Sequence, residues 1–267
     1  SGETGVERTR SALAENGIDC VGAGGNAAEA CQPLLLAVKG VKVGFLAYNL
    51  VNEHVFSAKG DRAGAASFTE CNVTDCVRLL KIKADVVVVA LHWGTSWTQE
   101  VTASQIVAAD QIHQAGADIV IGHHPHMLQA FKAYEKGLTI FSLGNFILRP
   151  DYPMPPEAHN SVVALIEIAE RKVRRCYLYP VRLDDYGVPR LPTRLEARII
   201  LSNLADLSEA FNTQIEVEKW IGKIRIRDVD SIVDGHFTLA LAHSGYNRMA
   251  VLSVYQQRSR NAPRGAS

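Results

Sequence analysis

The sequence predicts an α/β fold, and the clearest sign of it is a strand–helix–strand unit in the middle of the chain. Residues 86–91 form a continuous apolar run, which is typical of a buried strand. Residues 102–116 follow as one predicted helix, and residues 118–121 form a second apolar strand. Crossovers between parallel strands are nearly always right-handed, and ligands of open α/β sheets bind beyond the carboxyl ends of the strands. We therefore expect the residues after both strands to meet at one rim.

The rest of the chain alternates between helical and extended patterns. Asn26 is placed to cap a short helix, and Lys39-Gly40 predicts a tight hairpin turn. The predicted helices cover residues 6–16, 27–30, about 204–211, and a segment that begins after Asn72 or Thr74 and ends at residue 80. The predicted strands cover residues 18–21, 34–38, 41–48, 85–91, 128–134, 138–143, 162–168, 173–179, 224–229 and 237–241. Loops are expected at residues 52–66 and 151–160.

Composition excludes several functional classes. The 267 residues include 28 Lys and Arg and 28 Asp and Glu, so no net field favours nucleic acid or an anionic membrane surface. The longest apolar runs fall far short of the roughly 20 residues that a membrane-spanning helix needs. We expect no nucleic-acid partner and no membrane span in this chain.

The five cysteines show no metal-binding or redox spacing. Their number is odd, and no pair is separated by two residues. We interpret them as buried or idle thiols rather than as disulfides or metal ligands. The cysteines are Cys20, Cys31, Cys71, Cys76 and Cys176.

The two strands of the central unit are each followed by histidine. His92 ends the first apolar run, and the second leads into the Gly-His-His-Pro-His motif of residues 122–126. Neutral imidazole is a good ligand for zinc, iron, nickel and copper, and it is tolerated by manganese. Single histidines at strand ends usually cap or pack, but several converging on one rim favour a metal site. We predict His92, His124 and His126 as its ligands.

Two further residues at this rim are candidates for chemistry. His123 neighbours the predicted ligands but points to the opposite face of an extended backbone, so it is a ligand, a hydrogen-bond donor to one, or a catalytic acid. Asn145 follows a strand predicted to end at the same rim, where its amide binds metal or substrate or simply forms a turn. We predict both as catalytic. No Gly-x-Ser-x-Gly or catalytic cysteine signature supports a nucleophilic mechanism.

These motifs resemble the CapA/PgsA-type capsule synthesis proteins, the poly-γ-glutamate family related to calcineurin-like metallophosphatases. The similarity is strongest between residues 85 and 148 and weaker before and after it, to about residue 190. The segments that carry it are Asp85-Val86-Val87-Val88, His92-Trp93-Gly94, Ala115-Gly116-Ala117-Asp118, residues 122–126, and Ser142-Leu143-Gly144-Asn145-Phe146.

The resemblance implies a metallophosphatase-like, four-layer α/β/β/α sandwich with a dinuclear centre of Mn, Fe or Zn that activates water. His92, His124 and His126 match the family's carboxyl-side ligand positions. It also implies a phosphoesterase-like role in capsule or cell-envelope polymer synthesis, with a polymer or phosphoester substrate and subunits of a synthesis complex as partners. We expect this domain over residues 1–190, a C-terminal extension over 191–257 and a disordered tail over 258–267.

The chain also departs from the family pattern. The family's early Gly-Asp, Asn-Leu-Glu and Asn-Asn-His motifs would precede residue 2, so we expect an N-terminally incomplete domain that lacks the carboxylate half of the metal site. Ser96 and Lys132 stand at positions that are commonly acidic. The alternatives are therefore a non-catalytic accessory or scaffold subunit, or a metal-independent binding module. The resemblance implies the cell envelope, with any anchor upstream, and the cytoplasm is the alternative.

Overall fold

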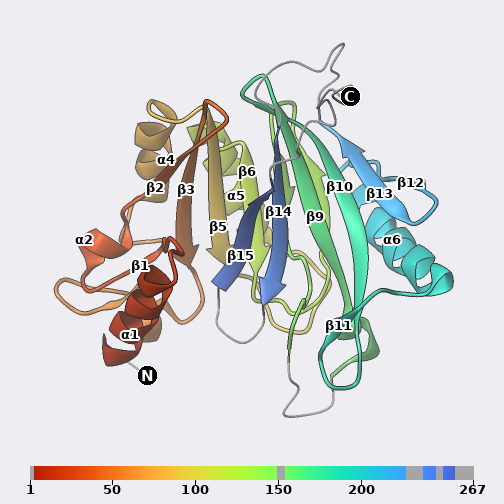
Figure 1. Ribbon diagram of the computed structural model, residues 1–267, viewed down its shortest axis with the longest axis horizontal. Coiled ribbons are helices and arrows are strands. Elements are labelled where there is room, and N and C mark those ends of the chain that lie inside the picture. The colour runs from red at the N-terminus through yellow and green to blue at the C-terminus, as the bar shows by residue number, and fades with distance from the viewer. Residues whose placement is uncertain (1–2, 149–153, 227–236, 245–248, 256–267) are drawn as a thin grey trace, which may run out of the picture.

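Two β-sheets packed face to face form the centre of this mixed α/β structure (Figure 1). The computed structural model describes residues 3–148, 154–226, 237–244 and 249–255. In the six-stranded sheet, the four central strands are parallel and an antiparallel strand lies at each edge. Its order is β2 (Leu34–Val38), β3 (Val41–Asn49), β5 (Val86–His92), β6 (Ile119–His123), β8 (Leu138–Ile140) and β7 (Phe131–Ala133).

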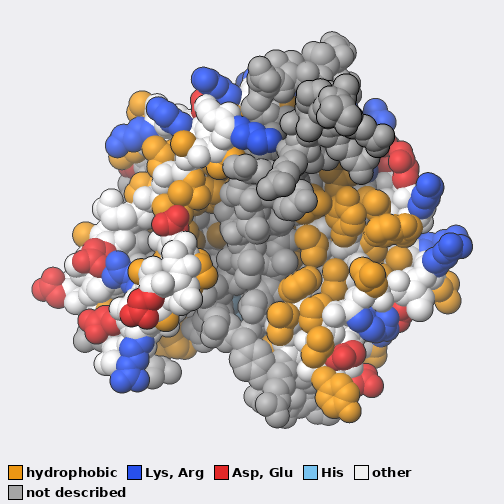
Figure 2. All heavy atoms as spheres, viewed as in Figure 1, with side chains coloured by type: hydrophobic (Ala, Val, Ile, Leu, Met, Phe, Trp, Pro, Cys, Tyr) orange, Lys and Arg blue, Asp and Glu red, His pale blue; other side chains and the backbone are white. Residues whose placement is uncertain are grey.

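The second sheet is antiparallel and has seven strands. Its order is β12 (Glu216–Glu218), β13 (Ile221–Arg225), β10 (Lys172–Leu183), β9 (Asn160–Ala169), β14 (Phe237–Ser244) and β15 (Met249–Tyr255), with β11 (Pro189–Arg190) paired to β10. The segment expected to be a C-terminal extension thus supplies four strands to this sheet. On the outer face of this sheet, the rings of Tyr179 and Trp220 meet edge to face. Figure 2 shows hydrophobic side chains gathered beside β14 and β15 on this face.

The continuous apolar run of β5 is explained by burial on both faces of the six-stranded sheet. Val86 and Val88 belong to the core between the two sheets, whereas Val87 and Val89 belong to the core beneath the helices. The helices on that outer face are α4 (Val73–Lys81) and α5 (Ala103–Ala115). Three layers, helical, β and β, therefore pack around β5, which positions the strand ends that carry the histidines.

Local signals fixed the central helix as predicted. Thr102 and Gln105 form a reciprocal capping box at the start of α5, and Gly116 ends the helix in a left-handed conformation. Asn26 caps α2 (Ala27–Ala30) by accepting a 2.8 Å hydrogen bond from the Glu29 amide. The remaining helices are α1 (Glu3–Glu15), α3 (Glu53–Phe56), α6 (Arg194–Glu209) and the 3-10 helix η1 (Pro156–His159).

Several predicted boundaries were wrong. Residues 18–21 form no strand but run along the surface, where Ile18 is 55% exposed, and pairing begins instead at β1 (Ala23–Gly24) with β4 (Gly64–Ala65). The loop predicted at 52–66 contains α3 and β4. Helix α6 starts about ten residues before the predicted 204, at a Thr193–Glu196 capping box that the sequence pattern contains. The predicted tail, 258–267, lies outside the described residues.

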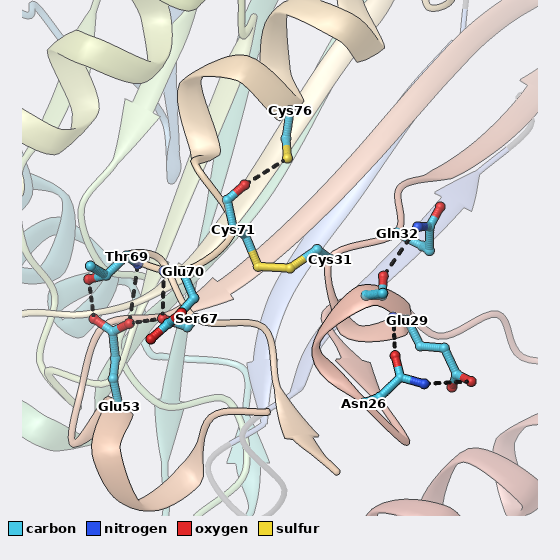
Figure 3. Close-up of a disulfide and its surroundings, with 11 residues drawn as sticks. Asn26, Glu29, Cys31, Gln32, Glu53, Ser67, Thr69, Glu70, Cys71 and Cys76 are labelled. Carbon is cyan, nitrogen blue, oxygen red and sulfur yellow. Dashed lines mark hydrogen bonds between the residues drawn. A yellow bond between two sulfur atoms is a disulfide. The ribbon is translucent and has the colours of Figure 1, made fainter. Parts of the chain in front are cut away.

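The interpretation of all five cysteines as thiols was also wrong. Cys31 and Cys71 form a disulfide that joins the end of α2 to the turn before α4 (Figure 3). Cys20, Cys76 and Cys176 are free. The two bonded cysteines lie 40 residues apart, so only the tertiary fold brings them together, and their spacing carried no signal.

Candidate metal centre

The candidate site lies at the carboxyl ends of β5 and β6. These strands are parallel neighbours, and their register places His92 directly beside His123. The backbone amide of Trp93 donates a 3.0 Å hydrogen bond to the His123 carbonyl, which continues the pairing beyond the strands. The two histidine motifs therefore share one rim, as the strand–helix–strand pattern predicted.

Three of the predicted histidines come together at this rim. The ring centroids of His92 and His124 are 4.6 Å apart, and those of His124 and His126 are 6.1 Å apart. His123 lies at the end of β6 and is only 6% exposed. His92, His124 and His126 therefore lie together at the rim, and their role as metal ligands stays a prediction.

The loop that carries the histidines has an unusual backbone. His124 and His126 have φ angles of 100° and 60°, and Trp97 in the facing loop has a φ of 63°. Such conformations cost non-glycine residues on the order of 1–3 kcal/mol each and cluster at functional sites. The Trp97 amide donates a 2.8 Å hydrogen bond to the Pro125 carbonyl, which joins the two loops. The fold thus holds this rim in a fixed and strained shape.

Asn145 is fully buried and fixes the orientation of His126. Its Nδ2 donates hydrogen bonds of 2.9 and 3.1 Å to the carbonyls of His126 and Ala158. Carbonyls only accept, so this network assigns the Asn145 oxygen to the 2.8 Å contact with His126 Nδ1. Nδ1 must then carry a proton, which leaves Nε2 as the nitrogen through which this ring would bind a metal.

The loop after β5 contacts the imidazoles of both His124 and His126, which the sequence did not predict. Ser96 Oγ lies 3.1 Å from His124 Nε2. The indole of Trp97 stacks on the His126 ring, with 4.9 Å between centroids. The one signal in the sequence was that Ser96 stands at a position that is commonly acidic in the related family. That signal marked Ser96 as a site position but did not predict its contact with His124.

Gly122 allows the strand to pass close to a buried tryptophan. A Cβ at this position would lie 1.9 Å from the Phe141 carbonyl oxygen and 2.2 Å from Trp93 Nε1. Those two atoms share a 3.0 Å hydrogen bond, and Trp93 is 1% exposed. Trp93 is therefore a buried packing residue directly after His92.

Within the described residues, the rim offers donor atoms of the type that transition metals bind, without a complete ligand set. Imidazole nitrogens from neighbouring strand ends suit Mn, Fe or Zn, and the hydrogen bond from His126 Nδ1 to the Asn145 oxygen fixes the orientation of that ring. Dinuclear hydrolytic centres also use carboxylates, and within the described part of the chain no group of three or more His, Cys, Asp or Glu is arranged to hold an ion. The histidines are consistent with a centre that needs further ligands.

Comparison with known proteins identifies relatives in capsule synthesis. "Capsule biosynthesis protein CapA" of Bacillus anthracis is 33% identical over 150 residues, covering 55% of this chain and 36% of the relative. "PGA biosynthesis protein CapA" of Bacillus subtilis is 32% identical over 147 residues, covering 55% and 39%. "Probable polyglutamine synthesis accessory protein Rv0574c" of Mycobacterium tuberculosis is 27% identical over 157 residues, covering 55% and 41%. The chain thus spans less than half the length of these relatives.

Among solved structures, the NAD nucleotidase of Haemophilus influenzae aligns with 70% of this chain and 40% of its own, at 11% identity and a TM-score of 0.32, a likeness too low to support an inference. In the described residues, no helix combines the length and apolarity needed to cross a bilayer. The family "Bacterial capsule synthesis protein PGA_cap" matches residues 1–150, which include all five candidate site residues. The chain therefore belongs to the PGA_cap family of bacterial capsule synthesis proteins.

Proposed function

We propose that this chain carries the histidine half of a metal-dependent, phosphoesterase-like protein that acts in the synthesis of a capsule or cell-envelope polymer, poly-γ-glutamate in particular. The observation that supports this most directly is the convergence of His92, His124 and His126 at adjacent strand ends. In this proposal the complete protein has the four-layer α/β/β/α sandwich of metallophosphatases, of which the described residues supply three layers around β5.

Each residue at the rim has a distinct part in this proposal. His92, His124 and His126 would hold divalent Mn, Fe or Zn, and a dinuclear centre of this kind supplies an activated water and stabilises charge on the attacking and leaving oxygens. Asn145 is a positioning residue, because its amide holds the Nδ1 proton of His126. His123 is the last residue of β6 and pairs with His92 of β5. In this proposal it supports the ligands or serves as a proton donor.

Metal analysis and a phosphodiester assay test the proposal. The purified complete protein should contain a transition metal, and His126→Ala in it should lower both metal content and turnover by roughly 10-fold or more, as expected for the loss of a ligand. His54→Ala is the matched control, because His54 is an exposed histidine on α3 outside the rim. Unchanged turnover in His126→Ala would refute the ligand role.

A second candidate is a non-catalytic accessory or scaffold subunit of a synthesis and export complex. Two observations favour it: in the described part of the chain no carboxylate joins the converging imidazoles, and Lys132 forms a 2.6 Å ion pair with Asp110. The Mycobacterium relative is itself named an accessory protein. Copurification with other synthesis subunits, without phosphodiester hydrolysis or bound metal, would support this candidate over the first.

The disulfide also indicates in which cellular compartment the protein acts. Disulfides persist in oxidising environments such as the cell surface and are rare in the cytosol. The Cys31–Cys71 bond therefore supports a cell-envelope location over the cytoplasmic alternative. Mass spectrometry of protein taken from intact cells, with free thiols blocked before lysis, would test it: a reduced pair would contradict this location.

A further inference from the structure

A buried glutamine side chain attaches the loop after β5, residues 95–101, to the segment that follows the histidine motif. Gln129 lies three residues after His126, and none of its surface is exposed. Its Nε2 donates hydrogen bonds of 2.8 Å to the Glu100 carbonyl and 3.2 Å to the Thr98 carbonyl. Two backbone carbonyls of the loop are therefore bound by a single side chain from a distant part of the chain.

A second buried glutamine fixes the direction of these hydrogen bonds. Carbonyl oxygens only accept, so the Gln129 group that faces Thr98 and Glu100 must be its NH₂ group. The Gln129 oxygen accepts a 3.0 Å hydrogen bond from Nε2 of Gln105, which is also buried. The Gln105 oxygen accepts in turn from the Thr102 amide at 3.0 Å, within the capping box of α5. The network therefore runs from the start of α5 through Gln129 to the loop.

The backbone of Gln129 joins this network to the segment that leads to Asn145. The Gln129 amide donates a 3.2 Å hydrogen bond to the Ser142 carbonyl, three residues before Asn145. Asn145 is the residue that orients His126. Gln129 is thus bound through its backbone to the segment that carries Asn145 and through its side chain to the loop that contacts the imidazoles.

The loop depends on such an attachment because its backbone is strained. Trp97 has a φ of 63°, a conformation that a non-glycine residue keeps only where the surrounding contacts hold it. In this conformation the Trp97 indole stacks on the His126 ring. The carbonyl of the next residue, Thr98, is one of the two that Gln129 binds. The hydrogen bonds from Gln129 therefore act directly beside the strained residue.

We propose that Gln129 is a positioning residue for the histidine rim. Through the loop of residues 95–101, it keeps the Ser96 hydroxyl beside His124. Through the same loop, it keeps the Trp97 indole stacked on His126. This inference rests on the proposed function, because it identifies what holds two of the proposed ligands in place before a metal binds.

Hydrogen exchange and nuclear magnetic resonance of the complete protein, with chelator present, test the proposal. Gln129→Met keeps the length of the side chain but removes its NH₂ donors. In this variant the Trp97 amide, which donates a 2.8 Å hydrogen bond to the Pro125 carbonyl, should exchange about 10-fold faster or more, because the loop opens more often. The His126 ring signals should move towards their positions in Trp97→Leu, which lacks the stacked indole. Chelator makes both results independent of metal, so failure here is distinguishable from failure of the phosphoesterase proposal.

Two further variants separate positioning from a general loss of stability. Thr139→Val is the matched control, since Thr139 is also buried and hydrogen-bonded but pairs with Val120 in the first half of β6, away from the rim. It should leave the Trp97 amide and the His126 ring signals unchanged. Gln129→Asn keeps the amide on a shorter side chain and should change both readouts in the same direction, which decides the question if Gln129→Met does not fold. Unchanged readouts in the folded Gln129 variants, or equal changes in Thr139→Val, would overturn the proposal.

Discussion

Replacing His113 should reduce the acid sensitivity of this protein, because His113 is held neutral inside the fold. Its Nδ1 lies 3.0 Å from the Ala117 carbonyl and its Nε2 lies 2.9 Å from the Thr139 hydroxyl. The Tyr134 ring lies against it at a tilt of 30°, with 3.9 Å between centroids. Burial lowers the pKa of His113 from 6.5 to about 4, although the Ala117 carbonyl and the Asp110 carboxylate act in the opposite direction.

The sign and size of the effect follow from this shift. A histidine whose pKa is lower in the folded state binds a proton more readily after unfolding, so the free energy of unfolding falls as the pH drops from about 6.5 towards 4. A pH of 5 lies about 1.5 units below the pKa of an unfolded histidine, so proton binding stabilises the unfolded state by about 2 kcal/mol. The loss approaches about 3 kcal/mol near pH 4.

Urea unfolding at a series of pH values measures this loss. The unsubstituted chain should lose about 2 kcal/mol more than His113→Asn between pH 7.5 and pH 5, because Asn keeps a donor near the Ala117 carbonyl but does not titrate. His54→Asn, at an exposed histidine, should keep the pH dependence of the unsubstituted chain. Parallel stability curves for His113→Asn and the unsubstituted chain would refute the reasoning.

Three further predictions concern the rim and the disulfide. Gly122→Ala should lower the free energy of unfolding by about 3 kcal/mol or more in urea unfolding, because its Cβ would lie 1.9 Å from the Phe141 carbonyl oxygen; a loss below 1 kcal/mol would contradict this. Asn145→Leu should cost about 2–3 kcal/mol, since it removes the donor to the buried Ala158 carbonyl and to the partly buried His126 carbonyl. It should also remove the acceptor that holds a proton on His126 Nδ1, a change visible in imidazole ¹⁵N shifts. Reducing the disulfide, which closes a span of 40 residues, should cost about 2–4 kcal/mol by thermal or urea unfolding, and an unchanged midpoint would count against it.

Much of the central unit was predictable because its signals are local. The apolar run of β5, the Thr102 cap and the Gly116 end of α5 each lie within a few residues of the structure that they specify. Once two parallel strands and their crossover are recognised, the handedness rule places their ends together. His92 and the motif at 122–126 could therefore be assigned to one rim before any coordinates were known.

Other parts of the site could not be predicted, because they depend on contacts between distant segments. The Asn145 amide reaches His126 across 19 residues, and Ser96 reaches His124 across 28. Gln129 carried no signal in the sequence, and its contact with the loop after β5 depends on how two distant segments pack. The sequence showed which side chains can do chemistry without showing which of them touch.

The sequence by itself determined the α/β class, the central crossover and the rim where the histidines gather, since periodicity, caps and topology rules act over short spans of chain. Only the tertiary structure decided the Cys31–Cys71 bond and the contact that orients His126. The physical reason is that directional contacts need two groups within about 3 Å of each other, and the packing of the two sheets and their loops sets such distances.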